Sequence, residues 1–205
     1  MRGRLEFWYE FASTYSYLSA MRIDDLAAHH GVEVVWKPFL LGPIFKAQGW
    51  DTSPFNIYPA KGRHMRRDLE RIAMARSLPF QMPQPFPQNS LYAARLAFAG
   101  EAEGWTPAFS RAVFKAEFGE GADISSREVL AGLLEGIGLR PAPYLDRIET
   151  PEIKDGLKAR TDEAQRRGIF GAPTFITARG ELFWGDDRLR QALRWAASEF
   201  FLDCE

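Results

Sequence analysis

The sequence predicts an α/β fold in which a β-α-β unit comes first, a β-β-α unit comes last, and an all-helical block is inserted between them. Residues 5–11 and 32–39 are rich in aromatic and β-branched side chains, as strands are, and a helical pattern separates them. Residues 173–177 and 181–184 form a second pair of strand patterns before a last helix. The residues between these units carry helical spacing and helix-start signals. We therefore expect one α/β domain with a helical insertion, not two tandem domains.

The first unit is expected to be a right-handed parallel unit, because strand, helix and strand follow one another with short connections. The helix should span residues 16–30, and Gly31 should end it. Its apolar residues fall on one face, as a helix packed against a sheet requires. These residues are Ala20, Ile23, Leu26 and Ala27.

The middle of the chain is predicted to contain two irregular segments and several helices. Residues 41–59 and 79–88 are punctuated by glycine and proline, which favour loops and break helices. Between them lies a helical pattern with Met65 and Leu69 on its inner face. Four more helices should follow, with start signals at Asn89, at Thr106-Pro107, at the capping-box pair Ser125 and Glu128, and at Thr150-Pro151.

The last unit should turn at Arg179-Gly180 and end in a helix capped by Asp186 or Asp187. Because strands occur only in the first and last units, the α/β domain is discontinuous in sequence. The predicted division is residues 1–42 and 165–205 for the α/β domain and residues 43–164 for the helical insertion.

The composition argues against several classes of protein. The 205 residues include 26 Lys or Arg and 27 Asp or Glu, and the resulting net charge of −1 argues against a general nucleic-acid binder. No apolar run approaches the roughly 18 residues needed to span a bilayer. No signal-peptide pattern is visible either. We expect a cytoplasmic protein with no part in the membrane.

Disulfide and metal chemistry have little support in the sequence. Cys204 is the only cysteine, so neither an internal disulfide nor a dithiol redox site can form. His29 and His30 are adjacent and would point to different sides of a helix, and His64 stands alone. We expect no metal site and interpret Cys204 as an incidental thiol.

Ser13 lies where an apolar strand pattern ends and a helical pattern begins. The plainer interpretation makes it an N-cap, whose hydroxyl accepts a hydrogen bond from the first turn. Its position also suits a ligand site, because such sites form at the carboxyl end of the first strand in parallel α/β units. The helix N-terminus there favours an anion, and a thiolate would be one.

Pro173 starts a strand pattern within the run Gly171-Ala172-Pro173-Thr174. A proline at the start of a strand is often cis and then exposes the preceding backbone to a ligand. Alternatively, this proline merely begins the strand. A β-α-β unit followed by a proline-led β-β-α unit is the combination found in thioredoxin-like folds.

The chain resembles the 2-hydroxychromene-2-carboxylate isomerases, relatives of kappa-class glutathione transferases, in four motifs: FASTYSYL, YPAKGRHMRRDLER, GIFGAPTF and FWGDDRL. The resemblance covers nearly the whole chain and implies a thioredoxin-like fold similar to that of bacterial disulfide oxidoreductases. Ser13 and Ser16 occupy the positions of the two cysteines of those oxidoreductases. Thr14 stands where the family commonly has proline, and His64 where it often has tyrosine. These departures bear on the rigidity of the turn and on substrate preference.

The resemblance implies glutathione as the cofactor and Ser13 as the catalytic residue. The Ser13 hydroxyl would hydrogen-bond the glutathione sulfur and favour its thiolate form. The tripeptide would lie as an extended strand against the backbone of Ala172, the residue before Pro173.

The resemblance also implies ionic contacts with the two ends of glutathione. Asp186 and Asp187 would meet the ammonium group, Lys61 would pair with a carboxylate, and Asn56 is a weaker match. A plainer interpretation makes the aspartates helix caps and the basic run around Lys61 a solvated helix face. The cofactor-binding residues implied in this way are Asn56, Lys61, Ala172, Pro173, Asp186 and Asp187.

The reaction implied by the resemblance is the isomerisation of 2-hydroxychromene-2-carboxylate to trans-o-hydroxybenzylidenepyruvate, with glutathione regenerated. The alternative is a kappa-like transferase or peroxidase acting on other electrophiles, and a third is a binding module without catalysis. We expect a homodimer that takes a small aromatic carboxylate as substrate. Some aromatic residues are candidates to wall the aryl pocket, although such residues more often belong to the core: Trp8, Phe39, Trp50, Phe86 and Phe118.

Overall fold

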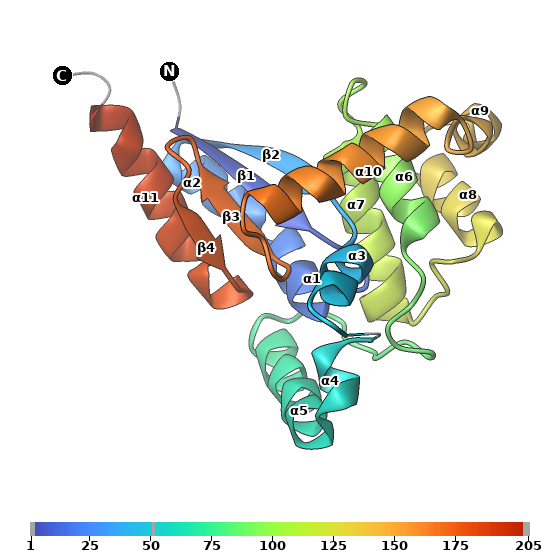
Figure 1. The fold of residues 1–205 in the computed structure, drawn as a ribbon, viewed down its shortest axis with the longest axis horizontal. Helices are drawn as coiled ribbons and strands as arrows, with labels where there is room; N and C mark the ends of the chain where they lie inside the picture. The colour runs from blue at the N-terminus through green and yellow to red at the C-terminus, as the bar shows by residue number, and fades with distance from the viewer. Residues whose placement is uncertain (1–2, 51, 203–205) are drawn as a thin grey trace.

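The computed structural model describes residues 3–50 and 52–202, and its centre is a four-stranded sheet (Figure 1). The strand order is β2-β1-β3-β4; β1 and β2 are parallel, whereas β3 is antiparallel to both β1 and β4. The predicted β-α-β and β-β-α units are therefore confirmed. The strands are β1 (Gly3–Tyr9), β2 (Val32–Pro38), β3 (Thr174–Thr177) and β4 (Leu182–Trp184).

The central strand β1 sends side chains into a separate core on each side of the sheet, because successive residues of a strand point to opposite faces. Phe7 lies in the larger core and stacks on Phe175 of β3 with ring centroids 5.5 Å apart. Trp8 lies in the smaller core with Phe39 and Ile176. Both faces of the sheet are therefore covered.

The connection between β1 and β2 is two helices, α1 (Thr14–Ala20) and α2 (Ile23–His30), where one helix over residues 16–30 was predicted. That prediction was wrong at Arg22. The Arg22 backbone leaves the helical region (φ −141°), and its guanidinium donates to the carboxylate and the carbonyl of Asp186. This distant acceptor was invisible in the local pattern. Gly31 ends α2 with a φ of +66°, as predicted.

The prediction of a loop over residues 41–59 was also wrong, because two short helices occupy much of it. Leu41 and Ile44 are buried beside Trp8 in the smaller core, so tertiary packing stabilises a helix that glycine and proline disfavour. Pro43 lies in the first turn, where a missing N–H costs nothing. The helices are α3 (Leu41–Ala47) and α4 (Pro54–Ile57).

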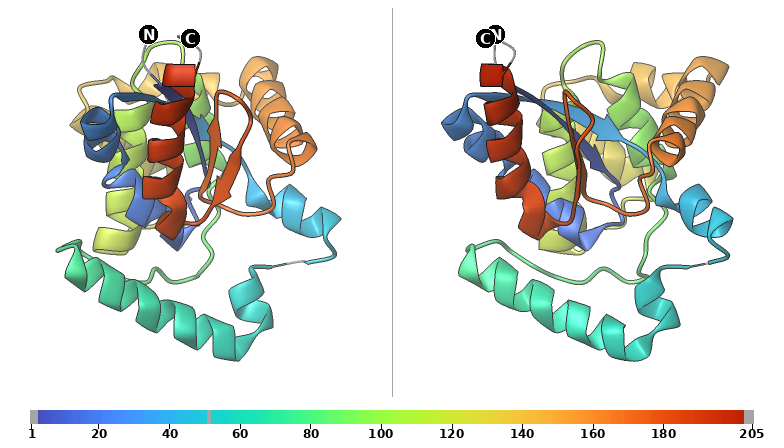
Figure 2. Two further views of the ribbon diagram at one scale, coloured as in Figure 1. Left: turned by 90° about the vertical axis from the view of Figure 1, so that its left-hand side faces the viewer. Right: turned by 60° about the vertical axis from the view of Figure 1, so that its left-hand side comes forward.

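The remaining helices surround the sheet, and residues 79–88 contain none, as predicted (Figure 2). Helices α4 and α5 lie together at the end of the molecule where β1 ends. The bounds are α5 (Pro59–Ala75), α6 (Leu91–Ala99), α7 (Thr106–Phe114), the π-helix η1 (Lys115–Gly119), α8 (Arg127–Gly136), α9 (Pro141–Arg147), α10 (Pro151–Arg166), the 3-10 helix η2 (Asp186–Arg188) and α11 (Leu189–Leu202).

Several predicted caps use other partners. Thr106 is already helical, and its hydroxyl donates to Ala97 O at 2.7 Å. Ser126, not Ser125, caps α8 by accepting from Val129 N at 3.3 Å. Short polar side chains have several backbone partners within reach, so a cap signal is accurate only to a residue or so.

At the other two predicted starts, Asn89 accepts from Leu91 N at 3.1 Å, ahead of α6. Thr150 precedes α10 but donates back to Arg147 O at 2.7 Å. These helices therefore begin close to their predicted positions, whichever side-chain bond forms.

The sheet and the middle helices share the larger core, which includes buried residues of β1, α6, α7, α8 and α10. Both predicted boundaries fall inside helices, one in α3 and one in α10. The division into residues 1–42 with 165–205 and residues 43–164 stays a prediction. Within residues 3–50 and 52–202, no helix is long and apolar enough to cross a membrane. Cys204 lies outside the described residues.

Candidate active site

Ser13 joins the N-terminus of α1 to a segment 159 positions later in the chain. Its hydroxyl oxygen accepts from Ser16 N at 3.2 Å, so Ser13 is the predicted N-cap. The same hydroxyl donates to Ala172 O at 2.9 Å. Ser13 N donates to Glu10 O at 3.1 Å and closes the turn after β1. Both interpretations of Ser13 are thus compatible: it caps α1 and it faces the segment around Pro173.

The segment around Pro173 is tied down on both sides. The Ala172–Pro173 peptide bond is cis. Thr174 Oγ1 donates to Gly171 O at 2.8 Å, and Gly185 N donates to Pro173 O at 2.9 Å. The Ala172 backbone therefore lies between the start of α1 and the end of β4.

Asp186 is a buried hub and not a helix cap. Its side chain is 3% exposed and accepts hydrogen bonds from Ser19 Oγ at 2.8 Å, Arg22 Nη2 at 2.9 Å and Arg76 Nη2 at 2.7 Å. These bonds tie α1, the start of α2 and the end of α5 to η2. Both carboxylate oxygens of Asp186 are thus engaged by donors from the protein itself.

Asp187, in contrast, leaves its carboxylate open to solvent. Its side chain is 73% exposed and lies 3.5 Å from the guanidinium of Arg188. The two adjacent aspartates of the motif thus have different surroundings. Of the pair, Asp187 is the one with a carboxylate accessible to a ligand.

Two adjoining cavities lie beside α5 and share Phe55 and Met65. One, of about 450 Å³, is lined by Tyr15, Lys61 and His64, among others. It reaches the start of α1, because Thr14 Oγ1 lies 3.9 Å from Met65 Sδ.

The second cavity, of about 400 Å³, is lined by Asn56, Arg63 and Arg66, among others. Asn56 Nδ2 donates to Thr52 Oγ1 at 3.1 Å, and Lys61 Nζ lies 4.8 Å from the centre of the Tyr58 ring. Both predicted carboxylate partners therefore line cavities at the end of the molecule that carries Ser13.

Tyr15, which lines the first cavity, has a neutral hydroxyl group. Burial, together with the hydrogen bond that its hydroxyl donates to Asp68 Oδ2 at 3.0 Å, raises the pKa of Tyr15. Its proton is therefore retained throughout the physiological pH range. Tyr15 can act as a hydrogen-bonding group but not as a base at neutral pH.

Most of the aromatic candidates for an aryl pocket belong to the core: Trp8, Phe39 and Phe118 are fully buried. Phe86 lines the second cavity, and Trp50 packs on Phe45 with ring centroids 5.6 Å apart. Phe86 is thus the candidate best placed to meet a ligand.

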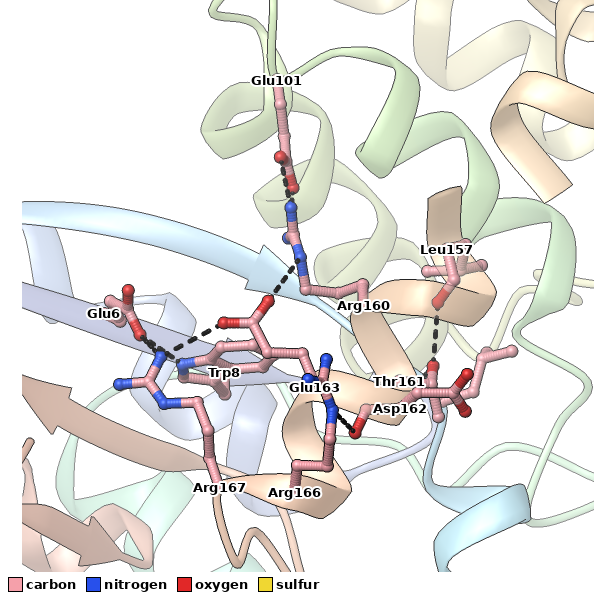
Figure 3. A network of polar contacts seen from close by, with 11 residues as sticks. Glu6, Trp8, Glu101, Leu157, Arg160, Thr161, Asp162, Glu163, Arg166 and Arg167 are labelled. Carbon is pink, nitrogen blue, oxygen red and sulfur yellow. Dashed lines mark hydrogen bonds and ion pairs between the residues drawn. The ribbon is translucent and has the colours of Figure 1, made fainter. Parts of the chain in front are cut away.

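Trp8 instead anchors α10 to the sheet (Figure 3). The guanidinium groups of Arg160 and Arg167 lie 5.8 Å and 5.5 Å from the centre of its ring. Its Nε1 donates to Glu6 Oε2 at 2.9 Å, and Arg160 binds Glu101 through two hydrogen bonds of 2.7 and 2.8 Å. Because α10 leads directly into the segment around Pro173, this network holds in place the helix that precedes the contact of Ala172 with Ser13.

Two buried glutamates, Glu10 and Glu117, were missed by sequence reasoning. Burial raises the pKa of Glu10 to about 7. Glu117 lies in η1 and is fully buried. Burial is the larger cause, and the charge of Glu10 the smaller cause, that raises the pKa of Glu117 well above the usual range. The available signal was a glutamate with an apolar residue on each side of it, as in FWYEF and AEF. Among the described residues, no group of three His, Cys, Asp or Glu side chains is arranged to hold a metal ion.

This geometry agrees with the comparisons with known proteins. Residues 4–194 match the family of DsbA-like thioredoxin domains, and the chain belongs to that family. It is 29% identical to a 2-hydroxychromene-2-carboxylate isomerase of Sphingobium xenophagum, over 92% of this chain and 95% of that protein. It is 25% identical to human glutathione S-transferase kappa 1, over 90% of this chain and 87% of that one.

A solved structure of a 2-hydroxychromene-2-carboxylate isomerase superimposes with a TM-score of 0.85. The two chains are 25% identical, and the match covers 98% of this chain and 97% of the other. The predicted resemblance and the thioredoxin-like fold are therefore confirmed. Relatives that are named isomerases match about nine-tenths of this chain, which supports an isomerase enzyme.

Proposed function

We propose that the protein is a glutathione-dependent isomerase of aromatic catabolism that converts 2-hydroxychromene-2-carboxylate to trans-o-hydroxybenzylidenepyruvate. The contact of the Ser13 hydroxyl with Ala172 O, at the N-terminus of α1, carries this proposal. It brings together a hydroxyl donor, a helix N-terminus and the backbone beside a cis-proline. The isomerases among the relatives, which match about nine-tenths of the chain, support this choice of reaction.

The side chains present fit the charged groups of glutathione. Ser13 and the N-terminus of α1 suit a thiolate, which supplies the nucleophile when glutathione is bound. Lys61 and Asn56 offer a cation and an amide donor to carboxylates from the cavities beside α5. Asp187 offers an open carboxylate to an ammonium group, whereas Asp186 is already bound by Arg22 and Arg76.

Ser13 would act by redirecting its single hydroxyl proton. In this structure the proton goes to Ala172 O, while the oxygen accepts from Ser16 N. Turning the proton toward a sulfur atom keeps the N-cap bond intact. The hydrogen bond that the Ser13 oxygen accepts from Ser16 N makes the Ser13 hydroxyl a stronger donor. Donation of this hydroxyl to the charged form of a thiol lowers the pKa of that thiol.

The backbone of Ala172, with Pro173 behind it, would hold the tripeptide in an extended conformation. A strand-like ligand gains affinity from such main-chain hydrogen bonds, and side-chain contacts at its ends then fix its register. The bonds of Thr174 and Gly185 to this segment keep it in place. Because this segment is already held in place, it loses less conformational entropy on binding a tripeptide than a flexible segment would.

A kappa-like glutathione transferase or peroxidase is the second candidate. The observation that favours it is the 25% identity with human glutathione S-transferase kappa 1 over 90% of this chain. Both functions need the same thiolate, and they differ in what happens to it: the isomerase regenerates glutathione, whereas the transferase leaves it on the product.

One experiment separates the two functions. The protein is mixed with 2-hydroxychromene-2-carboxylate, with and without glutathione, while the absorbance spectrum and the free-thiol concentration are followed. We expect isomerisation only with glutathione present and no loss of free thiol. Loss of free thiol when another electrophile replaces the chromene, without isomerisation of the chromene, would favour the transferase. No activity with either compound would reject both functions.

We also propose that the protein is a cytoplasmic homodimer. Trp184 and Trp195 are 51% and 48% accessible, and this is apolar surface that a second subunit would cover. Light scattering during size-exclusion chromatography tests this assembly, and a monomer mass at micromolar concentration would reject it.

A further inference from the structure

Two buried glutamates, one of them in the turn before Ser13, have no assigned role in the proposed reaction. Glu10 follows β1 and is 6% exposed, and Glu117 lies in the π-helix η1 and is 0% exposed. A π-helix is uncommon and often marks a functional position. Phe11, which follows Glu10, packs on Phe114 at the start of η1 with ring centroids 5.0 Å apart, and the charge of Glu10 raises the pKa of Glu117.

Glu10 has donors arranged around it, whereas Glu117 has none. Ser90 Oγ donates to Glu10 Oε1, and the Ala12 N–H faces the same carboxylate. Among the described residues, neither side-chain oxygen of Glu117 has a hydrogen-bond partner. A buried carboxylate without a partner is very costly, so Glu117 must carry its proton. A protonated carboxyl group is a donor in need of an acceptor.

The groups around the pair leave Glu10 as the charged acceptor. On η1 and just after it, Lys115 and Glu120 are exposed to solvent. From α1, Tyr17 packs on Phe118 of η1 and is neutral, because burial raises its pKa to about 12. No arginine or lysine contributes to the shifts of either carboxyl group. The carboxylate of Glu10 is thus the anion that a protonated Glu117 can stabilise.

Glu10 also controls the turn that presents Ser13. Its carbonyl accepts the Ser13 N–H at 3.1 Å, and its carboxylate attracts the N–H of Ala12, the residue just before Ser13. An ionised carboxylate can accept hydrogen bonds from Ser90 and Ala12 together, and protonation removes part of that capacity. The conformation of residues 10–13 is therefore coupled to the charge on Glu10.

We propose that Glu10 is a positioning residue for Ser13, and that Glu117 keeps Glu10 ionised by donating its proton toward that carboxylate through one water molecule. The pair holds one proton and one negative charge, with no net transfer of protons. The role of the pair in catalysis rests on the proposed function, whereas its effect on the Ser13 turn does not.

The first test measures the pair without glutathione. The Glu10 carboxyl resonance is followed by ¹³C NMR across pH and assigned by its absence from Glu10→Gln. In Glu117→Met, which has a similar length but no donor, the Glu10 midpoint should rise by one pH unit or more. In Glu117→Gln, which keeps an N–H donor, the rise should be clearly smaller, and the exposed Glu135→Gln is the control. Equal midpoints in the parent protein, Glu117→Met and Glu117→Gln would overturn the proposal.

The second test reads the position of Ser13. The Ser13 amide ¹⁵N resonance should titrate with the same midpoint as Glu10, and this midpoint should move upward in Glu117→Met. A Ser13 resonance that ignores the Glu10 titration would reject the positioning role. Neither NMR test needs glutathione, so failure of the proposed function is distinguishable from failure of this inference.

The third test applies if the protein isomerises the chromene. The acid limb of the kcat profile should then move to higher pH in Glu117→Met by the same amount as the Glu10 midpoint. The rates of Glu117→Met and the parent protein should converge at high pH, where Glu10 is ionised in both. A purely structural role for Glu117 would lower kcat equally at every pH and would overturn the coupling.

Discussion

The hydroxyl of Ser13 donates a hydrogen bond of 2.9 Å to the carbonyl oxygen of Ala172, the residue before a cis-proline. This bond links the start of the first helix to the start of the third strand across 159 sequence positions. It also assigns the serine proton to a backbone oxygen. A ligand that engages this backbone therefore also affects the hydroxyl of Ser13.

Ser13→Ala should change the chemistry of a bound thiol more than the stability of the fold. Loss of the cap to Ser16 N should cost about 1 kcal/mol. A hydrogen bond to a charged acceptor is worth about 1.5–3 kcal/mol, so the pKa of the bound thiol should rise by roughly one to two pH units. The ultraviolet absorbance of the thiolate measures this directly.

Ser126→Ala is the matched control for that variant, because Ser126 caps α8 in the same way. It should lose a similar amount of stability without any change in the thiol titration. If Ser13→Ala and Ser126→Ala give the same titration curve, Ser13 is only a helix cap.

Glutathione should stabilise the protein against unfolding. A ligand at one hundred times its dissociation constant adds about 2.7 kcal/mol to the free energy of unfolding, which thermal melts detect as a higher Tm. Lys61→Ala should need more glutathione for the same rise, and the exposed Lys158→Ala on α10 serves as its control. A Tm unaffected by millimolar glutathione would point to a binding module for another ligand.

The adjacent aspartates should have opposite phenotypes. Asp186→Ala removes the shared partner of Arg22 and Arg76, and breaking a buried ion pair of this kind costs about 3–5 kcal/mol. Asp187→Ala, at an exposed position, should leave the free energy of unfolding within about 0.5 kcal/mol of the parent protein.

Under the proposed function, Asp187→Ala should also raise the apparent KM for glutathione and change kcat little. Denaturant melts and initial-rate kinetics measure the two effects separately. Normal glutathione binding by Asp187→Ala would remove this residue from the site.

Stability should fall as pH rises from about 4.5 to about 7. Burial raises the pKa of Glu10 from 4.5 to about 7, so the folded state binds more protons than the unfolded state in this range. Its contribution is fully present below pH 4.5 and is lost as pH rises through about 7, a change of roughly 3 kcal/mol. Glu10→Gln should flatten this part of the stability profile in urea melts. An unchanged slope in that variant would mean that Glu10 does not titrate in this range.

Much of the fold could be read from local sequence, because strands and helices differ in the period of their apolar residues. The aromatic runs of β1 and β2, the stop at Gly31 and the two short strands after Pro173 all lie where the pattern predicted them. Ser13 could be singled out because a hydroxyl at a strand-to-helix junction has a definite place in such folds.

Tertiary structure decided the features whose partners are distant in sequence. Helix α3 forms because Leu41 and Ile44 pack against Trp8, and α1 separates from α2 where Arg22 turns to Asp186. The same contact makes Asp186 a hub and leaves Asp187 open to solvent, although the two residues are neighbours in the sequence. The charge states of Glu10 and Glu117 depend on burial by other elements. Sequence periodicity reports which face of an element is apolar, whereas the charge and hydrogen bonding of a side chain depend on what that face meets.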